Sequence, residues 1–445
     1  MRLPFSLLLL VCVGACSGGW QVKKETAKGE GAESVREGES EKGLPPAFVA
    51  LRKLRRELDR YGFQLAWHYD FRQRIRNIYY VPMKNSLHRL YLETEGNVVY
   101  RLDPRDGKVI WQCTFNGALA FAPVPFDYED VERRRAIEKR LQRLELTDIE
   151  EAKRLTTELG RFPPECVVVV GNTVYCVDDS SGKILWKKTL SFDLACKPMV
   201  GFNHVYLVNW QHRLYALRKG DCVIEWDILL NSDVVGGGVY KGAHLFIGDA
   251  SGEVYCIDGA NGDIVWTFRT LDRVVASPNV WYLKMYVGSC DGFLYSINAE
   301  AGFETWKFAC QWPVVDQPVA IGYVIYAIAE KKGRRMIYAV DRKANLLWRQ
   351  RNCVKVLMQG RSWRRRTLSY ILDASGNIRA VVTLSPVKGE IGGVRWHLPA
   401  YSYGFEFFVS NPSDRRCIRK NIARRCIYMA TKFGLLVAIE EMPHF

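Results

Sequence analysis

Short runs of alternating apolar and polar residues recur along most of this chain, and the copies align on a tryptophan. Four of them read VYRLDPRDGKVIW, VYCVDDSSGKILW, VYCIDGANGDIVW and LYSINAEAGFETW. A hydrophobic period of two is typical of a half-buried β-strand. Between the two runs of each copy stand an Asp or Asn and a Gly, the residues that a tight turn requires. The pattern therefore predicts a β-hairpin that is repeated many times.

The spacing of the copies identifies the architecture. Four tryptophans lie 40 residues apart, and four others extend the series with looser spacing: Trp186, Trp226, Trp266 and Trp306, then Trp67, Trp111, Trp348 and Trp396. Two further β-rich runs precede each hairpin, and four short antiparallel strands per repeat make the blade of a β-propeller. We therefore predict an all-β fold, an eight-bladed propeller of four-stranded antiparallel blades, over residues 62–445.

The two ends of the repeat array are incomplete in complementary ways. Trp67 has no three strands before it, and the C-terminal run KFGLLVAIE has no tryptophan after it. A ring closed by both chain ends leaves only short protected edges. We expect the strand from Gln64 to Asp70 to close the last blade as its outer strand.

The motif Ala-x-Asp-x-x-x-Gly-x-x-x-Trp resembles the tryptophan-docking repeat of quinoprotein-type, or PQQ-like, propellers. The copies ending at Trp111, Trp186, Trp266 and Trp306 match it well. In the copy ending at Trp226, Arg218 replaces the Asp and Cys222 replaces the Gly, and the copy before Trp396 is degenerate. The resemblance implies that each tryptophan stacks between adjacent blades, a structural role.

The N-terminus has the features of an export signal. Arg2 precedes an apolar run at 7–13 that is too short to span a bilayer. The sequence Val-Gly-Ala-Cys resembles a bacterial lipoprotein cleavage box, which implies a signal peptide at 1–16 and lipidation of Cys16; ordinary secretion is the alternative. Ser17 favours the outer membrane. We expect a lipid-anchored protein on the periplasmic side of the outer membrane.

Two segments separate this signal from the ring. Residues 17–44 are rich in Gly, Glu, Lys and Ser. Such a composition has little apolar surface to bury and predicts a disordered tether. Residues 45–61 are predicted to form a helix.

One blade carries a long insertion. Trp111 and Trp186 are 75 residues apart, and the excess, at 127–160, has the pattern of a helical hairpin. Arg135, Lys139 and Arg143 line the side of its first helix that is opposite the apolar residues. They are candidate partner-binding residues, and a solvated cover over one blade is the alternative interpretation.

Charge and cysteine usage narrow the choice of partner and of compartment. The chain has 63 basic and 48 acidic residues, a formal charge of +15, which can attract nucleic acid, anionic lipid or acidic protein. The export signal argues against nucleic acid. Of 13 cysteines, Cys176 and Cys256 occupy a small buried position of the repeat, so we expect buried thiols rather than a disulfide framework. Cys417 and Cys426 could pair across a hairpin.

No catalytic constellation is present in the sequence. There is no Cys-Cys pair, no Gly-x-Ser-x-Gly and no phosphate loop, and the seven histidines are scattered. We therefore expect no catalytic residue, no cofactor and no metal site.

The signal, the tether and eight such blades together resemble the BamB family of propeller lipoproteins, which belong to the outer-membrane β-barrel assembly machinery. The resemblance implies a non-enzymatic, membrane-anchored scaffold for envelope protein partners. Two alternatives stay open: a PQQ-dependent periplasmic dehydrogenase or ligand sensor, and a binder of peptidoglycan or anionic glycan. Quinone binding with calcium would identify the first, and salt-sensitive co-sedimentation would identify the second.

Overall fold

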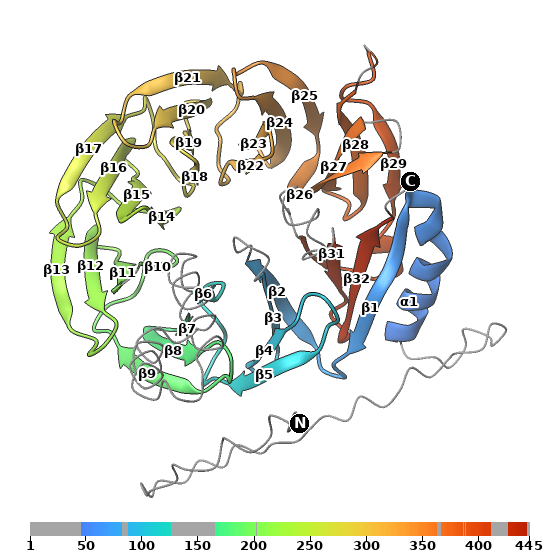
Figure 1. The fold of residues 1–445 in the computed structure, drawn as a ribbon, viewed down its shortest axis with the longest axis horizontal. Coiled ribbons are helices and arrows are strands. Elements are labelled where there is room, and N and C mark those ends of the chain that lie inside the picture. The colour runs from blue at the N-terminus through green and yellow to red at the C-terminus, as the bar shows by residue number, and fades with distance from the viewer. Residues whose placement is uncertain are drawn as a thin grey trace, which may run out of the picture. The chain divides into compact units, whose positions relative to one another are not determined.

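The strands of this chain hydrogen-bond four at a time into eight antiparallel sheets, arranged around a central axis (Figure 1). The structure, a computed structural model, describes residues 46–442 except 82–87, 126–164, 202, 363–365, 386, 388 and 411–425. The prediction of an eight-bladed propeller is confirmed. The predicted insertion at 127–160, with Arg135, Lys139 and Arg143, lies outside the described residues, as do Cys16 and Cys417.

The blades follow the chain in order. Blade 1 consists of β2 (Ile75–Val81), β3 (Arg89–Thr94), β4 (Val98–Leu102) and β5 (Val109–Thr114), and blade 2 of β6 (Val124–Pro125), β7 (Glu165–Val170), β8 (Thr173–Asp178) and β9 (Ile184–Thr189). Blade 3 consists of β10 (Met199–Val200), β11 (His204–Val208), β12 (Arg213–Arg218) and β13 (Ile224–Leu229), and blade 4 of β14 (Gly238–Lys241), β15 (His244–Gly248), β16 (Glu253–Asp258) and β17 (Ile264–Arg269).

Blade 5 consists of β18 (Asn279–Trp281), β19 (Lys284–Gly288), β20 (Phe293–Asn298) and β21 (Glu304–Ala309), and blade 6 of β22 (Val319–Ile321), β23 (Val324–Lys331), β24 (Arg334–Asp341) and β25 (Leu346–Arg351). Blade 7 consists of β26 (Cys353–Ser362), β27 (Arg366–Asp373), β28 (Ile378–Leu384) and β29 (Val394–Leu398), and blade 8 of β30 (Phe407–Ser410), β31 (Cys426–Ala430), β32 (Leu435–Glu441) and β1 (Phe63–Asp70).

The meander of each blade gives the ring two distinct faces. Because neighbouring strands run antiparallel, the turns between first and second strands and between third and fourth strands lie on one face, which we call face A. The turns between second and third strands lie on the opposite face, face B, together with the connections from one blade to the next.

The ring is closed by both ends of the chain, as the sequence predicts. The N-terminal strand β1 pairs antiparallel with β32, with Gln64 opposite Glu440 and Tyr69 opposite Leu436. β1 is the outer strand of blade 8, whose other three strands come from the C-terminus (Figure 1). The last blade is therefore complete only when both termini are in place.

A short helix covers the joint between the last two blades. The segment expected to be helical contains α1 (Pro46–Glu57) and the 3-10 turn η1 (Leu58–Tyr61). Leu51, Leu54 and Leu58 are buried in one hydrophobic cluster with Leu357 of blade 7 and Val437 of blade 8. α1 and β1 thus stabilise the same closure from two sides.

The repeat tryptophans pack against the turn of the following blade. A Cβ atom at Gly302, in the third-to-fourth-strand turn of blade 5, would lie 2.7 Å from Cδ2 of Trp266 in blade 4. The same contact joins Gly107 to Trp67, Gly182 to Trp111 and Gly262 to Trp226. The Nε1 atom of Trp266 donates to the carbonyl of Ala299 in the same turn, at 3.3 Å. The tryptophans are therefore joints between blades.

Substitution of one of these glycines should be costly. Gly302 has a φ of +75° and is in contact with Trp266. We expect Gly302→Ala to lower the free energy of unfolding by about 2–4 kcal/mol, from left-handed strain and from displacement of the indole. Gly333 is the matched control, because its φ is +72° but open space surrounds it. Gly333→Ala should cost about 1 kcal/mol. If urea denaturation gave the same loss of unfolding free energy for both variants, the contact with the indole would contribute nothing to stability.

One joint contains a buried ion cluster that the repeat pattern does not predict. The residue opposite the tryptophan is small in most blades, such as Cys176 or Ala216, but in blade 1 Arg101 stands opposite Trp111. Its Nε lies 3.1 Å from Oδ1 of Asp179, a residue of the blade 2 turn that is 2% exposed. Arg89 also forms an ion pair with Asp179, and Tyr91 donates its hydroxyl to Oδ1 at 2.8 Å.

The cysteines of the described blades are largely core residues. Cys166, Cys176, Cys256 and Cys310 are free and buried. Burial raises the pKa of the Cys256 thiol to about 12, so this group stays protonated and packs as a small apolar side chain. Pairing of Cys417 with Cys426 stays a prediction.

Candidate interaction surface

The most exposed large hydrophobic side chain in the described part of the chain is Leu271, at 80%. It lies on face B, in the connection between β17 of blade 4 and β18 of blade 5. Asp272 and Arg273, which follow it, are also exposed. Single exposed leucines are common on protein surfaces, so the neighbours of Leu271 decide whether it belongs to an interaction surface.

The backbone beneath Leu271 is held in place by both neighbouring blades. The amide of Leu271 donates to Oδ2 of Asp291 in blade 5, at 3.0 Å, and Thr270 donates its amide to the carbonyl of Gly252 in blade 4, at 2.9 Å. On the far side, Val274 donates to the carbonyl of Asp249, at 3.0 Å. The backbone that carries the leucine is therefore held in place, which lowers the entropy that this connection loses when a partner binds.

A buried tyrosine supports the same segment from below. Tyr295 donates its hydroxyl to Oδ2 of Asp291, at 2.7 Å, the atom that also accepts the amide of Leu271. Burial, together with the hydrogen bond to Asp291, raises the pKa of Tyr295, so the phenol stays a donor at any physiological pH. The support is therefore independent of pH in this range.

Comparison of the repeats shows that Leu271 is unusual. Three equivalent connections carry Ser191, Asn231 and Gln311 at this position, and all three residues are exposed. Only this copy among the four has an apolar side chain there. The sequence does contain this difference, an apolar residue at a position that is polar in the other three repeats. It becomes visible only when the connections between blades are aligned as well as the hairpins.

Other exposed apolar residues accompany Leu271 on face B. Val235 lies in the preceding connection, between blades 3 and 4, while Leu229 ends β13 and Trp210 lies in the β11–β12 turn. All three are more than 40% exposed. Together with Arg273 they give blades 3 to 5 an apolar surface that includes a tryptophan and an arginine, two residue types enriched at the centres of protein interfaces.

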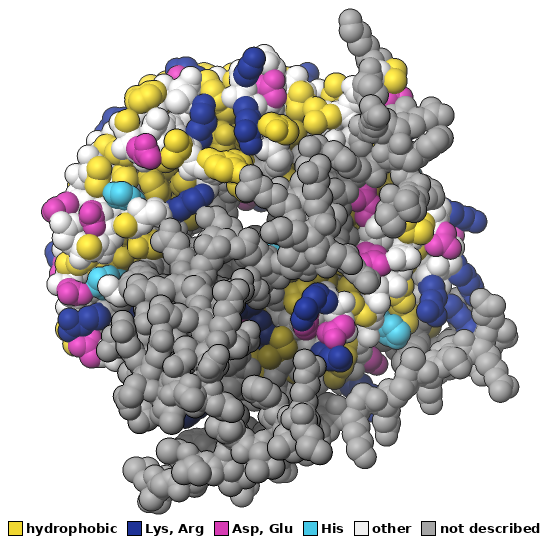
Figure 2. Space-filling model, in the orientation of Figure 1, with side chains coloured by type: hydrophobic (Ala, Val, Ile, Leu, Met, Phe, Trp, Pro, Cys, Tyr) yellow, Lys and Arg dark blue, Asp and Glu magenta, His cyan; other side chains and the backbone are white. Residues whose placement is uncertain are grey.

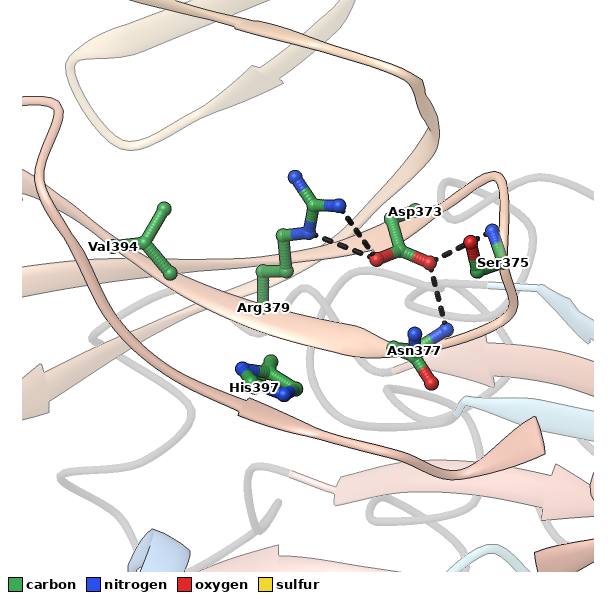
Figure 3. A pocket seen from close by; sticks show the side chains of 6 residues that line it. All are labelled: Asp373, Ser375, Asn377, Arg379, Val394 and His397. Atoms are coloured by element: carbon green, nitrogen blue, oxygen red, sulfur yellow. Dashed lines mark hydrogen bonds and ion pairs between the residues drawn. The ribbon is translucent and has the colours of Figure 1, made fainter. Parts of the chain in front are cut away.

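A second feature is a pocket at the β27–β28 hairpin of blade 7, lined by Asp373, Ser375, Asn377, Arg379, Val394 and His397 (Figure 3). Its carboxylate is already engaged. Oδ1 of Asp373 accepts the amides of Ser375 and Asn377, both at 2.9 Å, and Oδ2 lies 2.8 Å from Nε of Arg379. Asp249 of blade 4 binds its own turn in the same way. The polar side chains that line this pocket therefore stabilise the β27–β28 turn, and they need no ligand to account for them.

The described residues contain neither a metal-binding cluster nor a membrane-spanning helix. No group of three or more His, Cys, Asp or Glu side chains is placed to hold a metal ion there. In the same part of the chain, neither α1 nor any other helix combines the length and the apolar character that a membrane span needs.

Comparison with known proteins agrees with this geometry. A family model described as outer membrane protein assembly factor BamB matches residues 95–237, 226–292 and 282–404. The chain is therefore a β-propeller of PQQ-like repeats. It belongs to the BamB family, since these matches cover well over half of its length. No curated protein matches it.

Solved structures show the same fold at low sequence identity. BamB from Moraxella catarrhalis superposes with a TM-score of 0.58 and 13% identity, over 86% of this chain and 99% of that chain. The computationally designed Ika8 protein gives 0.55 and 10%, over 85% and 99%. The C-terminal WD40 domain of Sif2 gives 0.52 and 9%, over 85% and 98%. At such identities these likenesses establish the fold alone.

Proposed function

We propose that this protein is a non-enzymatic scaffold of the bacterial envelope that docks a protein partner of outer-membrane assembly. Membership of the BamB family supports a role in outer-membrane assembly, and the exposed Leu271 on face B supports docking of a partner there. The ring supplies a rigid frame, because each blade is joined to the next by its tryptophan. The function then depends on side chains that the connections between blades expose to a partner, rather than on a pocket.

Anchoring is part of this proposal and rests on the sequence. Cys16 follows a lipoprotein-like cleavage box, and its acylation would hold the chain on the periplasmic side of the outer membrane. Cys16→Ala should prevent incorporation of labelled fatty acid and move the protein to the soluble periplasmic fraction. Retention of this variant in the membrane after a high-salt wash would contradict the proposed anchor.

The docking surface can be tested by affinity capture from detergent-solubilised membranes. We expect Leu271→Ser to reduce recovery of an outer-membrane assembly protein by about tenfold, the usual effect of removing a central apolar anchor. Leu346→Ser is the matched control, because Leu346 is an exposed leucine on the outer strand β25. Equal recovery with both variants would exclude Leu271 from the docking surface.

The insertion is a second proposed contact of the same scaffold. Triple substitution of Arg135, Lys139 and Arg143 by Glu should leave the melting temperature nearly unchanged, because exposed charges contribute little to stability. It should weaken capture of an acidic partner, and wild-type capture should fall with added salt. Unchanged capture would make the insertion a cover over blade 2.

A further inference from the structure

Two neighbouring blades carry apolar residues at the tips of their inner hairpins on face A. Tyr282 and Leu283 form the two-residue turn between β18 and β19 of blade 5, and Tyr323 lies in the corresponding β22–β23 turn of blade 6. Their exposures are 64%, 59% and 60%. Figure 2 shows hydrophobic side chains gathered over these elements, with Lys and Arg among them.

The turn of blade 5 is built against the conformational preference of its residue. Tyr282 has a φ of +55°, whereas the equivalent positions in blades 4 and 6 are Gly242 and Gly322, with φ of +59° and +62°. A bulky residue is strained in this left-handed region. Because the side chain is largely exposed, core packing does not compensate for the strain. A strained, exposed residue is therefore a candidate for a functional contact.

The residues around these tips are basic. Lys284 follows Leu283 directly, and the guanidinium of Arg342 lies 4.7 Å from the ring centre of Tyr323. Arg342 also donates to the carbonyl of Gly322, at 2.9 Å, which ties it to the blade 6 tip. Lys343 is its exposed neighbour. Arg342 and Lys343 are exposed, and neither forms an ion pair among the described residues. Lys284 is half-buried and donates to Oγ1 of Thr305, at 3.3 Å.

The carboxylates of the same two blades on this face lie away from the inner tips or are engaged. Glu300 and Glu304 belong to the outer β20–β21 hairpin of blade 5. Asp341 accepts the amides of Lys343 and Asn345, at 2.8 Å each, within its own turn. The tips themselves therefore combine Tyr and Leu with the exposed cations Arg342 and Lys343, and Asp341 is the carboxylate of the same turn.

We propose that face A of blades 5 and 6 rests on an anionic phospholipid surface, with the Tyr282–Leu283 and Tyr323 tips inserted among the headgroups. Tyrosine favours the membrane interface, where its ring is in an apolar layer and its hydroxyl is in water. Nearby Lys and Arg side chains are attracted to acidic headgroups. Separate convex tips suit a soft lipid layer better than the shaped pocket of a protein interface.

This contact is distinct from the docking surface of the proposed function. Leu271 is on face B, so a ring lying on the membrane through face A would present Leu271 away from the lipid. The inference does not depend on Leu271 binding a partner. Each face can be altered while the other serves as its control.

The test is flotation of the mature chain, residues 17–445 without a lipid anchor, with vesicles of phosphatidylethanolamine and phosphatidylglycerol. Vesicles of phosphatidylcholine serve as the uncharged comparison. We expect binding to the anionic vesicles that weakens with salt. The double variant Tyr282→Gly, Leu283→Ala, which reproduces the turn of blade 4, should bind about tenfold more weakly. It should melt at the same or a higher temperature, because glycine removes the strain.

Two further variants complete the test. Tyr323→Ser should weaken vesicle binding without changing the blade 5 turn, and Leu271→Ser should leave vesicle binding unchanged. Absence of binding by the parent chain, or equal binding by the double variant, would overturn the proposal. So would a double variant that keeps its vesicle binding but loses a captured envelope protein, since face A would then dock protein.

Discussion

Deletion of residues 1–71 is expected to abolish the monomeric ring, whereas deletion of 1–44 should leave a soluble monomer. The longer deletion removes β1, so that β32 keeps an unpaired edge along Leu435–Glu441. It also removes Leu54 and Phe63, which are fully buried between blades 7 and 8. An exposed apolar strand edge is a template for association with other chains. We therefore expect aggregation of the longer deletion in size-exclusion chromatography.

The shorter deletion is the control, because it retains α1, η1 and every strand of the ring. The two deletions should differ in melting behaviour as well as in size, with a cooperative transition only for the shorter one. If the chain lacking residues 1–71 elutes as a monomer and melts like the other, the ring does not need β1 for closure.

The second large effect is expected at the buried ion cluster between blades 1 and 2. Asp179→Asn removes the carboxylate that Arg89 and Arg101 share, in a site where the two arginine side chains are only 10% and 9% exposed. Removal of one member of a buried ion pair typically costs about 3–5 kcal/mol, because the remaining charge stays desolvated. We expect the urea midpoint of unfolding to fall accordingly.

Arg101→Cys is the matched variant, since it restores the small residue that blades 2 and 4 carry opposite their tryptophans. Asp179 then keeps Arg89 as its ion-pair partner, and the pair is neutral overall. We expect a much smaller loss than for Asp179→Asn. A loss of equal size would show that packing around Trp111, rather than charge, determines the stability of this joint.

Much of the fold could be predicted because each repeat is determined by residues that lie close together in the sequence. Alternating apolar residues, a turn glycine and a tryptophan define each hairpin, and the incomplete end copies define the closure. The joint of Trp266 with Gly302 illustrates the reason: a residue that must have positive φ and no side chain leaves a visible pattern. Such positions can be predicted from one sequence.

Features that depend on contacts between distant residues could not be predicted in this way. Arg101 looks like a departure from the repeat, and only the structure places Asp179 of the next blade and Arg89 of its own blade around it. Leu271 was missed for a different reason. Its exposure follows from the connection in which it lies, and that becomes evident only when Ser191, Asn231 and Gln311 are set beside it.

The pairing of β1 with β32 also has a consequence for the order of folding. Gln64 and Glu440 form a side-chain hydrogen bond although 376 residues separate them in sequence. During synthesis the first strand emerges long before its partner exists, and contacts of such separation form slowly. The nascent chain therefore cannot close into a ring before its last strands are made. For the export proposed above, such a delay would keep the chain open during translocation, and the ring would close only after the final blade has followed.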